Sequence, residues 1–239
     1  FLLGSLASCI FVYGIALIYV SLSIIGVYEI SFAISIIGPE NVPLTTFVVL
    51  ILIIVGLLFK VAAAPFQAWA PDVYQGSPTG YVGYMATVAK AASFIVLARL
   101  VAVSLIFIID QFDLFFSAVV IMSVLAGALF AANQSDLKRL IAYSGVIQSG
   151  FILSGISSGV YGISASTFYL ITYIIQLIGI FTVFSIISGQ LSSDFQISNI
   201  SGLFKENKFI TITFSIFMLG LAGLPLTSGF VSKFILITN

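Results

Sequence analysis

Long apolar runs that carry almost no charge are the feature that most restricts how this chain can fold. The first run, residues 1–25, contains no Asp, Glu, Lys or Arg. About 20 consecutive apolar residues are enough for a helix to cross the hydrocarbon core of a bilayer. Charged residues make up 7% of the sequence, whereas about 25% is typical of soluble domains. The sequence therefore predicts an all-α, polytopic membrane protein.

Polar interruptions divide the chain into about seven expected spans. These are residues 1–25, 45 to a break near 65, 81–109, 114–132, the polar junction 133–139 to about 157, 163–187, and 209 onward with a break near 225. Residues 26–44, which include Glu29, Pro39, Glu40 and Pro43, are expected to form a loop. Residues 1–239 are interpreted as one transmembrane domain, a fragment cut at both ends.

The charges in the loops sort onto two sides of the expected membrane. One side holds the basic residues Lys138, Arg139, Lys205 and Lys208. The loops of the other side hold no Lys or Arg, and their carboxylates are Glu29, Glu40, Asp110 and Asp113. Positively charged loops stay on the inner side of a membrane, so the basic side is expected to face the cytoplasm, or the matrix or stroma of an organelle. The sequence contains no run of basic residues of the kind that binds nucleic acid, so no nucleic-acid partner is expected. The expected surroundings are the lipid bilayer.

Residues that bind metals and redox cofactors are almost missing. The chain has no histidine, and its single cysteine, Cys9, lies in an apolar run. Haem, iron–sulfur and zinc sites are built mainly from these two residue types. We therefore expect no metal or cofactor site and no internal disulfide.

Four basic residues lie within apolar segments, namely Lys60, Lys90, Arg99 and Lys233. A charge at the centre of an isolated helix costs about 2.5–3.5 kcal/mol on insertion scales. At 1.5 Å per residue, Lys90 lies roughly 14 Å and 28 Å from the two ends of its expected span, so neither membrane surface is easily reached. For Lys60 and Lys233 an interior role and snorkelling to the headgroups both stay open. Arg99 is expected to snorkel or to form a structural pair.

Two prolines interrupt apolar spans near lysines. Pro65 offers no N–H to the carbonyl of Val61, and Pro225 offers none to that of Leu221. Within a membrane such carbonyls are tolerated only where protein or a water-filled cavity receives them, the alternative being a simple proline kink. The two broken spans are expected to run in opposite directions, as in inverted-repeat transporters.

A buried lysine suits proton transfer, because burial disfavours the charged form of a lysine and favours release of its proton. No Asp or Glu lies within an expected span. Either water and lysines alone carry a proton path, or a carboxylate partner lies outside these residues.

Four stretches carry a resemblance to a known family. They are residues 59–79 (FKVAAAPFQAWAPDVYQGSPT), 88–92 (VAKAA), 133–144 (NQSDLKRLIAYS) and 221–234 (LAGLPLTSGFVSKF). In this order they resemble the antiporter-like membrane subunits of NADH-quinone oxidoreductase, the respiratory complex I family with its chloroplast relative. The similarity is greatest to subunit N, called subunit 2 in organelles.

The resemblance implies a fourteen-helix inverted-repeat fold of which this chain is the middle portion. It implies that Lys60, Lys90 and Lys233 relay protons at mid-membrane depth, with Lys60 paired to a glutamate on a helix before residue 1. Other membrane subunits would be partners. NADH, FMN, iron–sulfur clusters and quinone would be bound by other subunits, so this chain would be part of a translocase without a redox site of its own. Its location would be a bacterial inner membrane, or the inner or thylakoid membrane of an organelle.

Four positions depart from the usual family pattern. Gln67 and Gln148 stand where histidine is frequent, and glutamine can support a chain of water molecules but cannot titrate. Gly80 and Leu226 stand where proline is frequent, which affects only the expected local geometry.

Two other interpretations stay open. A subunit of a multisubunit sodium/proton antiporter, or of a related membrane-bound hydrogenase, would share the lysines and the breaks. A purely structural protein would need all three lysines to snorkel. Because residues 69–74 (WAPDVY) fit the oxidoreductase better, the expected function is proton translocation coupled to redox chemistry in other subunits.

Overall fold

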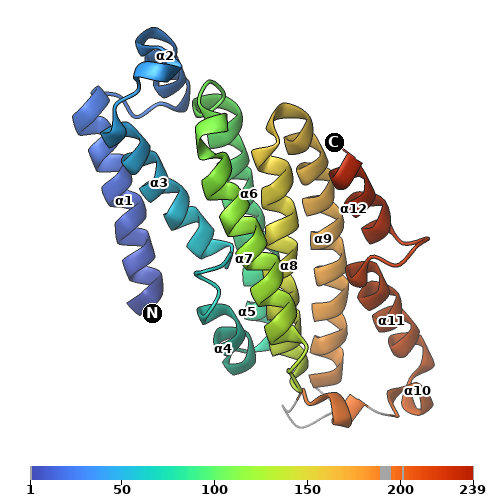
Figure 1. Ribbon diagram of the computed structural model, residues 1–239. Helices are drawn as coiled ribbons and strands as arrows, with labels where there is room; N and C mark the ends of the chain where they lie inside the picture. The colour runs from blue at the N-terminus through green and yellow to red at the C-terminus, as the bar shows by residue number, and fades with distance from the viewer. Residues whose placement is uncertain (1, 189–194, 201, 239) are drawn as a thin grey trace.

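The computed structural model describes residues 2–188, 195–200 and 202–238. Within these ranges the regular structure is helical, apart from one isolated antiparallel bridge between Asp136 and Gln196. The long helices lie side by side (Figure 1). The predicted all-α fold is confirmed.

The elements vary widely in length. In chain order they are α1 (Leu2–Leu22), α2 (Val27–Ile37), η1 (Pro39–Asn41), α3 (Leu44–Lys60), α4 (Trp69–Gly76), α5 (Thr79–Tyr84), η2 (Met85–Ala89), α6 (Lys90–Arg99), η3 (Leu100–Ser104), η4 (Ile109–Phe112), α7 (Asp113–Ala131), α8 (Leu137–Ser157), α9 (Gly159–Ser188), η5 (Ile197–Ile200), α10 (Leu203–Glu206), α11 (Lys208–Ala222) and α12 (Ser228–Thr238). Among the described residues, five stretches are long and apolar enough to cross a membrane: Leu2–Leu22, Thr79–Ser104, Ile109–Ala131, Leu137–Ser157 and Gly159–Ser188. The total of about seven spans counts α3 with α4, and α11 with α12, as broken spans, and it remains a prediction.

Both predicted breaks are present. Pro65 lies in the segment between the end of α3 and the start of α4, and Pro225 lies between the end of α11 and the start of α12. In Figure 1, α3 runs downward into its break whereas α11 runs upward into its own. The two broken helices therefore have the opposite orientations that the sequence predicts.

The predicted loop at residues 26–44 is wrong in its first half, because Val27–Ile37 form α2. The Glu29 carboxylate accepts a hydrogen bond at 3.4 Å from the N–H of the glycine that precedes the helix, which closes its first turn. Ile30 and Ile34, four residues apart on one face, are buried. With 11 residues α2 is too short to cross a bilayer, so it does not change which side the following loops face.

The span that carries Lys90 is continuous but not uniformly α-helical. Thr79–Ser104 runs through α5, the π-helical segment η2, α6 and a second π-helical segment, η3. Lys90 is the first residue of α6 and directly follows η2. Since π-helical turns are rare and occur frequently at functional sites, this irregularity marks the position of Lys90.

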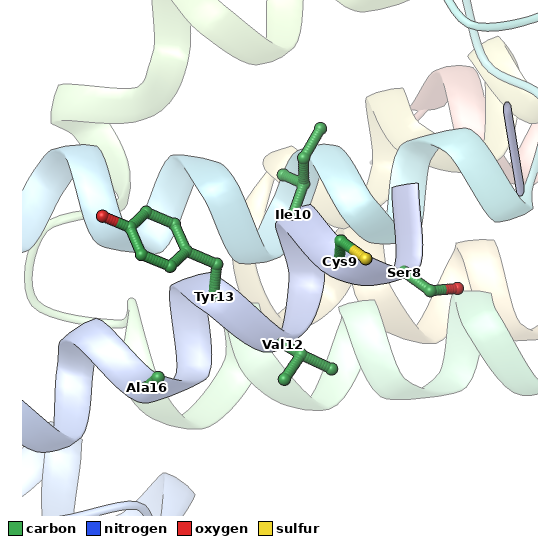
Figure 2. Close-up of a pocket in the computed structure, with 6 residues that line it drawn as sticks. All are labelled: Ser8, Cys9, Ile10, Val12, Tyr13 and Ala16. Atoms are coloured by element: carbon green, nitrogen blue, oxygen red, sulfur yellow. The ribbon is translucent and has the colours of Figure 1, made fainter. Parts of the chain in front are cut away.

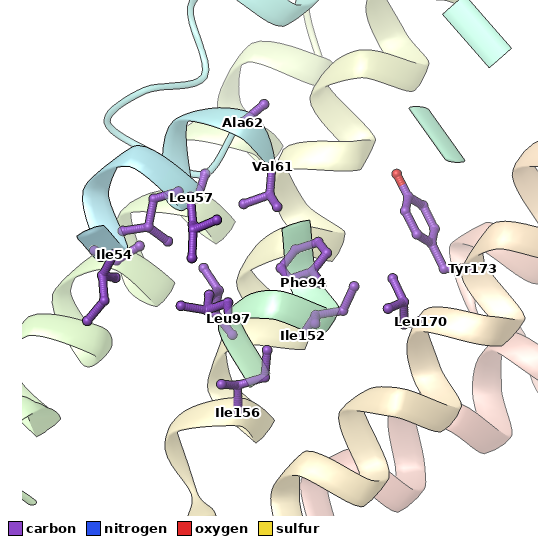
Figure 3. Close-up of a cluster of buried hydrophobic side chains, with 14 of the residues drawn as sticks. Ile54, Leu57, Val61, Ala62, Phe94, Leu97, Ile152, Ile156, Leu170 and Tyr173 are labelled. Carbon is purple, nitrogen blue, oxygen red and sulfur yellow. The ribbon is translucent and has the colours of Figure 1, made fainter. Parts of the chain in front are cut away.

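Helix α8 lies in the interior of the bundle. In its most apolar stretch 61% of the residues are buried, compared with 17% in α1. Buried side chains from the end of α3 and from α6, α8 and α9 meet in one cluster. Figure 3 labels Ile54, Leu57, Val61, Ala62, Phe94, Leu97, Ile152, Ile156, Leu170 and Tyr173 of this cluster. The first break is thus embedded in the apolar core.

The charged ends of the helices agree with the predicted sides, with one difference. The α7–α8 junction and α10 lie at the lower end in Figure 1, and α2 lies at the upper end. Lys138 is not a solvated loop residue: it is 6% exposed, and its Nζ donates a hydrogen bond to the Ser77 carbonyl at 2.9 Å. Its neighbour Arg139 forms an ion pair with Asp72 at 2.6 Å, which joins α8 to α4.

Candidate functional site

Lys90 is buried in the middle of the bundle. It is 4% exposed, and its Nζ donates a hydrogen bond to the carbonyl oxygen of Gly145 in α8 at 2.7 Å. The same nitrogen lies 5.8 Å from the ring centre of Tyr173 in α9, within range of a cation–π contact. Among the described residues the one ion pair is Arg139–Asp72, so Lys90 has no carboxylate partner there. A carbonyl dipole and a ring face compensate its charge less completely than an anion would.

Gly145 allows Lys90 to come this close to α8. A Cβ atom at residue 145 would lie 2.9 Å from Tyr173 Oη and 3.1 Å from Lys90 Nζ, which is tighter than ordinary contact. Ser149, one turn further along α8, has its Oγ 2.8 Å from the same Gly145 carbonyl. The lysine therefore meets α8 where no side chain intervenes and where a hydroxyl shares the backbone acceptor.

The first break, between α3 and α4, is closed by hydroxyl groups of two neighbouring helices. The Val61 carbonyl, left without its helical partner by the proline, accepts a hydrogen bond from Ser149 Oγ of α8 at 2.9 Å. The Ala64 N–H donates to Ser123 Oγ of α7 at 2.9 Å. Residues 61–64 are at most 2% exposed, so these bonds take the place of water. Of the two partners that the sequence allows for this carbonyl, protein or a water-filled cavity, the structure shows protein.

The second break, between α11 and α12, is closed by an amide and a lysine. The Leu221 carbonyl accepts from Gln148 Nε2 of α8 at 3.1 Å and from Lys233 Nζ of α12 at 3.3 Å. Lys233 also donates to the Ala222 carbonyl at 3.0 Å. Leu226 turns the chain with a φ of 75°, which proline cannot adopt, so leucine at this position does alter the local geometry. Gln148 and Ser149, which are adjacent in α8, thus donate hydrogen bonds to carbonyls of the second and the first break.

A narrow internal space lies beside these groups. It measures about 160 Å³, is too narrow for a water molecule, and is lined by residues that include Tyr169, Tyr173, Gln176 and Lys233. Gln148 lines it too and accepts a hydrogen bond from Tyr169 Oη. Lys233 lines this space directly, and Lys90 lies next to it through its contact with Tyr173.

Lys60 lies outside this internal space. Its side chain is exposed, and its Nζ lies 5.1 Å from the ring centre of Phe11 in α1. Lys60 lines a groove of about 1060 Å³, together with residues that include Trp69 and Asp72 of α4. The structure therefore brings Lys90 and Lys233 towards one space and leaves Lys60 at this groove, so its place on an interior proton path stays a prediction.

Two further predicted residues are placed by the structure. The Oε1 atom of Gln67 is buried and accepts no hydrogen bond from the described residues. Such an amide oxygen can accept from water, and support of a water chain by Gln67 stays a prediction. Arg99 is exposed and its guanidinium lies 5.8 Å from the ring centre of Tyr28 in α2, and the choice between its two expected roles stays a prediction.

The hollow on α1 drawn in Figure 2 is not a second candidate site. Its lining residues all come from one helix: Ser8, Cys9, Ile10, Val12, Tyr13 and Ala16. A hollow with a single helical wall is an open stretch of helix surface. Its mostly apolar side chains suit contact with lipid or with another membrane helix.

The whole chain matches one known family. Residues 1–239 match the family described as "NADH:quinone oxidoreductase/Mrp antiporter, TM". The chain belongs to this family. It is 40% identical over 239 residues to NADH-quinone oxidoreductase subunit N of Mycobacterium bovis, and the alignment covers 98% of this chain and 44% of that relative. It is 35% identical over 234 residues to NAD(P)H-quinone oxidoreductase subunit 2 of Trichodesmium erythraeum, with 97% and 44% covered.

Solved structures of NADH:quinone oxidoreductase/Mrp antiporter proteins share the fold. A chain of respiratory complex I from Thermus thermophilus with bound aureothin aligns with a TM-score of 0.82 and 34% identity, covering 99% of this chain and 50% of that one. A chain of the Mrp complex from Dietzia aligns with a TM-score of 0.88 and 25% identity, with 99% and 43% covered. The chain thus spans about half the length of its relatives or less. It is an integral, multi-pass membrane protein with the antiporter-like fold, as predicted.

The sequence reasoning singled out Gln148 but missed the two serines that close the first break. A spacing of four was the available signal, because Gly145 precedes Ser149 by four residues and Gly127 follows Ser123 by four. Residues four apart lie on one face of a helix. A glycine and a small hydroxyl on one face of an apolar helix indicate that another backbone approaches there.

Proposed function

We propose that this chain is the middle portion of the proton-translocating membrane subunit of an NAD(P)H-quinone oxidoreductase and that it relays protons through Lys60, Lys90 and Lys233. The observation that carries the proposal is the burial of the Lys90 ammonium against the Gly145 carbonyl, away from any described carboxylate. Without an anionic partner nearby, the charged form of a buried lysine is stabilised less and releases its proton more readily. A lysine in this setting can give up its proton and take it back.

The proposed path between the lysines runs along the narrow space beside α8. Gln148 and Tyr169 offer neutral donors and acceptors that can orient water without titrating near neutral pH. Since the space is too narrow for water in this conformation, transfer requires these side chains to move apart. NADH, flavin, iron–sulfur clusters and quinone are proposed to be bound by other subunits, whose redox reaction drives that movement.

The proposal is tested by Lys90→Met in the full-length subunit within its complex. Protons taken up per NADH oxidised are measured in inverted membrane vesicles. We expect this ratio to fall well below that of the wild type because the exchangeable proton at residue 90 is gone. Lys205→Met, which removes an exposed lysine of α10, is the matched control and is expected to leave the ratio unchanged. An unchanged ratio in Lys90→Met would instead favour a structural role for the lysine.

A sodium/proton antiporter subunit is the second candidate, favoured by the TM-score of 0.88 with the Mrp complex from Dietzia. It would use the same lysines and breaks. Proton movement driven by a sodium gradient, without NADH oxidation, would select this function over the first.

A further inference from the structure

Ser149 stands between two carbonyl groups and can serve only one of them at a time. Its Oγ lies 2.9 Å from the Val61 carbonyl oxygen and 2.8 Å from that of Gly145, and the residue is fully buried. A hydroxyl group has a single hydrogen to donate. The direction in which this hydrogen points is therefore a choice between the first break and the backbone of α8.

The two carbonyls do not depend equally on that hydrogen. The Gly145 oxygen has a second side-chain donor, the Nζ of Lys90 at 2.7 Å. The Val61 oxygen is buried and lies four residues before Pro65, which has no N–H to give. Leaving a buried carbonyl without a donor is unfavourable, so while Lys90 holds Gly145 the hydroxyl of Ser149 is best used on Val61.

The hydrogen bonding of Ser149 changes when Lys90 loses its proton or moves away from Gly145. Charge-assisted hydrogen bonds are the stronger ones, so a neutral or displaced Lys90 gives up part of its hold on the Gly145 oxygen. The Ser149 hydroxyl then divides its time between both carbonyls, and Val61 is unpaired for part of that time. Val61 directly follows Lys60, the last residue of α3.

We infer that Ser149 is a positioning residue that couples Lys90 to the end of α3 carrying Lys60, by rotation of its hydroxyl between two carbonyl oxygens. No covalent bond forms or breaks at Ser149. The proton that Lys90 releases leaves along the path of the proposed function, on which this inference rests. The coupling is local to α8 and the first break, because the second break is held by Gln148 and Lys233.

The test follows backbone hydrogen exchange at residues 61–64 in the full-length subunit within its complex. Ser149→Ala is expected to speed exchange there about tenfold, because the Val61 carbonyl loses its donor. Ser149→Thr keeps a hydroxyl and is expected to restore slow exchange. Ser154→Ala is the matched control on the same helix, since that hydroxyl bonds only to the Phe151 carbonyl one turn before it.

A double variant separates coupling from a merely structural bond. Lys90→Met alone is expected to speed exchange at residues 61–64 several-fold, through redistribution of the Ser149 hydroxyl. In the Ser149→Ala background the same Lys90→Met change is expected to add nothing. Additive effects, or an unchanged exchange rate in Lys90→Met, would overturn the coupling.

The outcomes also distinguish this inference from the proposed function. If Lys90→Met lowers protons per NADH but leaves exchange at residues 61–64 unchanged, Lys90 translocates protons without Ser149. If exchange shows the coupling but protons per NADH are unchanged, the coupling stands and the proposed function fails.

Discussion

The two breaks have similar sequences, a lysine near a proline in an apolar helix, yet they are held together differently. At the first break the donors and acceptors come from neighbouring helices, through Ser149 and Ser123, and the chain there is buried. At the second break the lysine of the broken span itself, Lys233, bonds to two carbonyls of the break, those of Leu221 and Ala222. Lys60 makes no such contact and instead lies over Phe11.

The order of lysine and proline along the chain explains this difference. Side chains of an α-helix tilt towards its N-terminus. Lys233 comes after its break, on α12, so its side chain points back to the carbonyls that end α11. Lys60 comes before its break, at the end of α3, so its side chain points back along α3. Lys233 therefore reaches the carbonyls of its break, whereas Lys60 is directed away from those of its own.

Removing Lys233 is expected to have the largest effect on this comparison. Lys233→Met takes the charged donor from the Leu221 and Ala222 carbonyls, which is worth about 1.5–3 kcal/mol. Hydrogen exchange at residues 221–227 of the full-length subunit should speed by about ten- to a hundredfold, while residues 61–64 stay protected. Lys208→Met, at the other end of α11, is the control. An equal loss of protection at residues 61–64 and 221–227 would contradict the conclusion that different groups close the two breaks.

Removing Ser123 tests the first break from the side of α7. Ser123→Ala leaves the buried Ala64 N–H without its acceptor, at a cost of about 1–2 kcal/mol. Exchange of that amide should speed about tenfold, with residues 221–227 unaffected. Ser117→Ala, an exposed serine of the same helix, should leave both breaks as they are. Continued protection of the Ala64 amide would mean that another group closes this break.

Removing Gln148 tests how far α8 supports the second break. Gln148→Leu takes one of two donors from the Leu221 carbonyl and leaves the Lys233 donor in place, so we expect a loss of about 1 kcal/mol. Exchange at residues 221–227 should speed less than in Lys233→Met. A larger effect than in Lys233→Met would show that α8, and not the lysine, closes this break.

Removing Lys60 should have the smallest structural effect. Lys60 bonds to no carbonyl of the first break. In Lys60→Met the local stability of residues 61–64, measured by hydrogen exchange, should therefore change by no more than about 0.5 kcal/mol. Protons taken up per NADH are measured on the same vesicles. A fall in this ratio with an intact break would place Lys60 on the proton path by function alone, and faster exchange at residues 61–64 would contradict the comparison.

Apolar runs and prolines were enough to predict the helical membrane fold and the two breaks, because both follow from backbone hydrogen bonding in a bilayer. The short helix α2 was missed, since Glu29 and Pro39 look like loop residues until the apolar face of Ile30 and Ile34 is considered. The need of Val61 and Leu221 for partners was predictable, but the partners were not. Which helix lies beside a break depends on packing between distant segments, and residues 61 and 149 are far apart in the sequence.

The narrow space lined by Gln148, Tyr173 and Lys233 has an energetic consequence for the proposed proton path. A proton crossing a membrane at 100 mV dissipates about 2.3 kcal/mol, so a standing file of water there would discharge the gradient continuously. On the proposed path, the hydrogen bond between Tyr169 and Gln148 would keep the gradient from leaking, because protons would pass only while these side chains are apart.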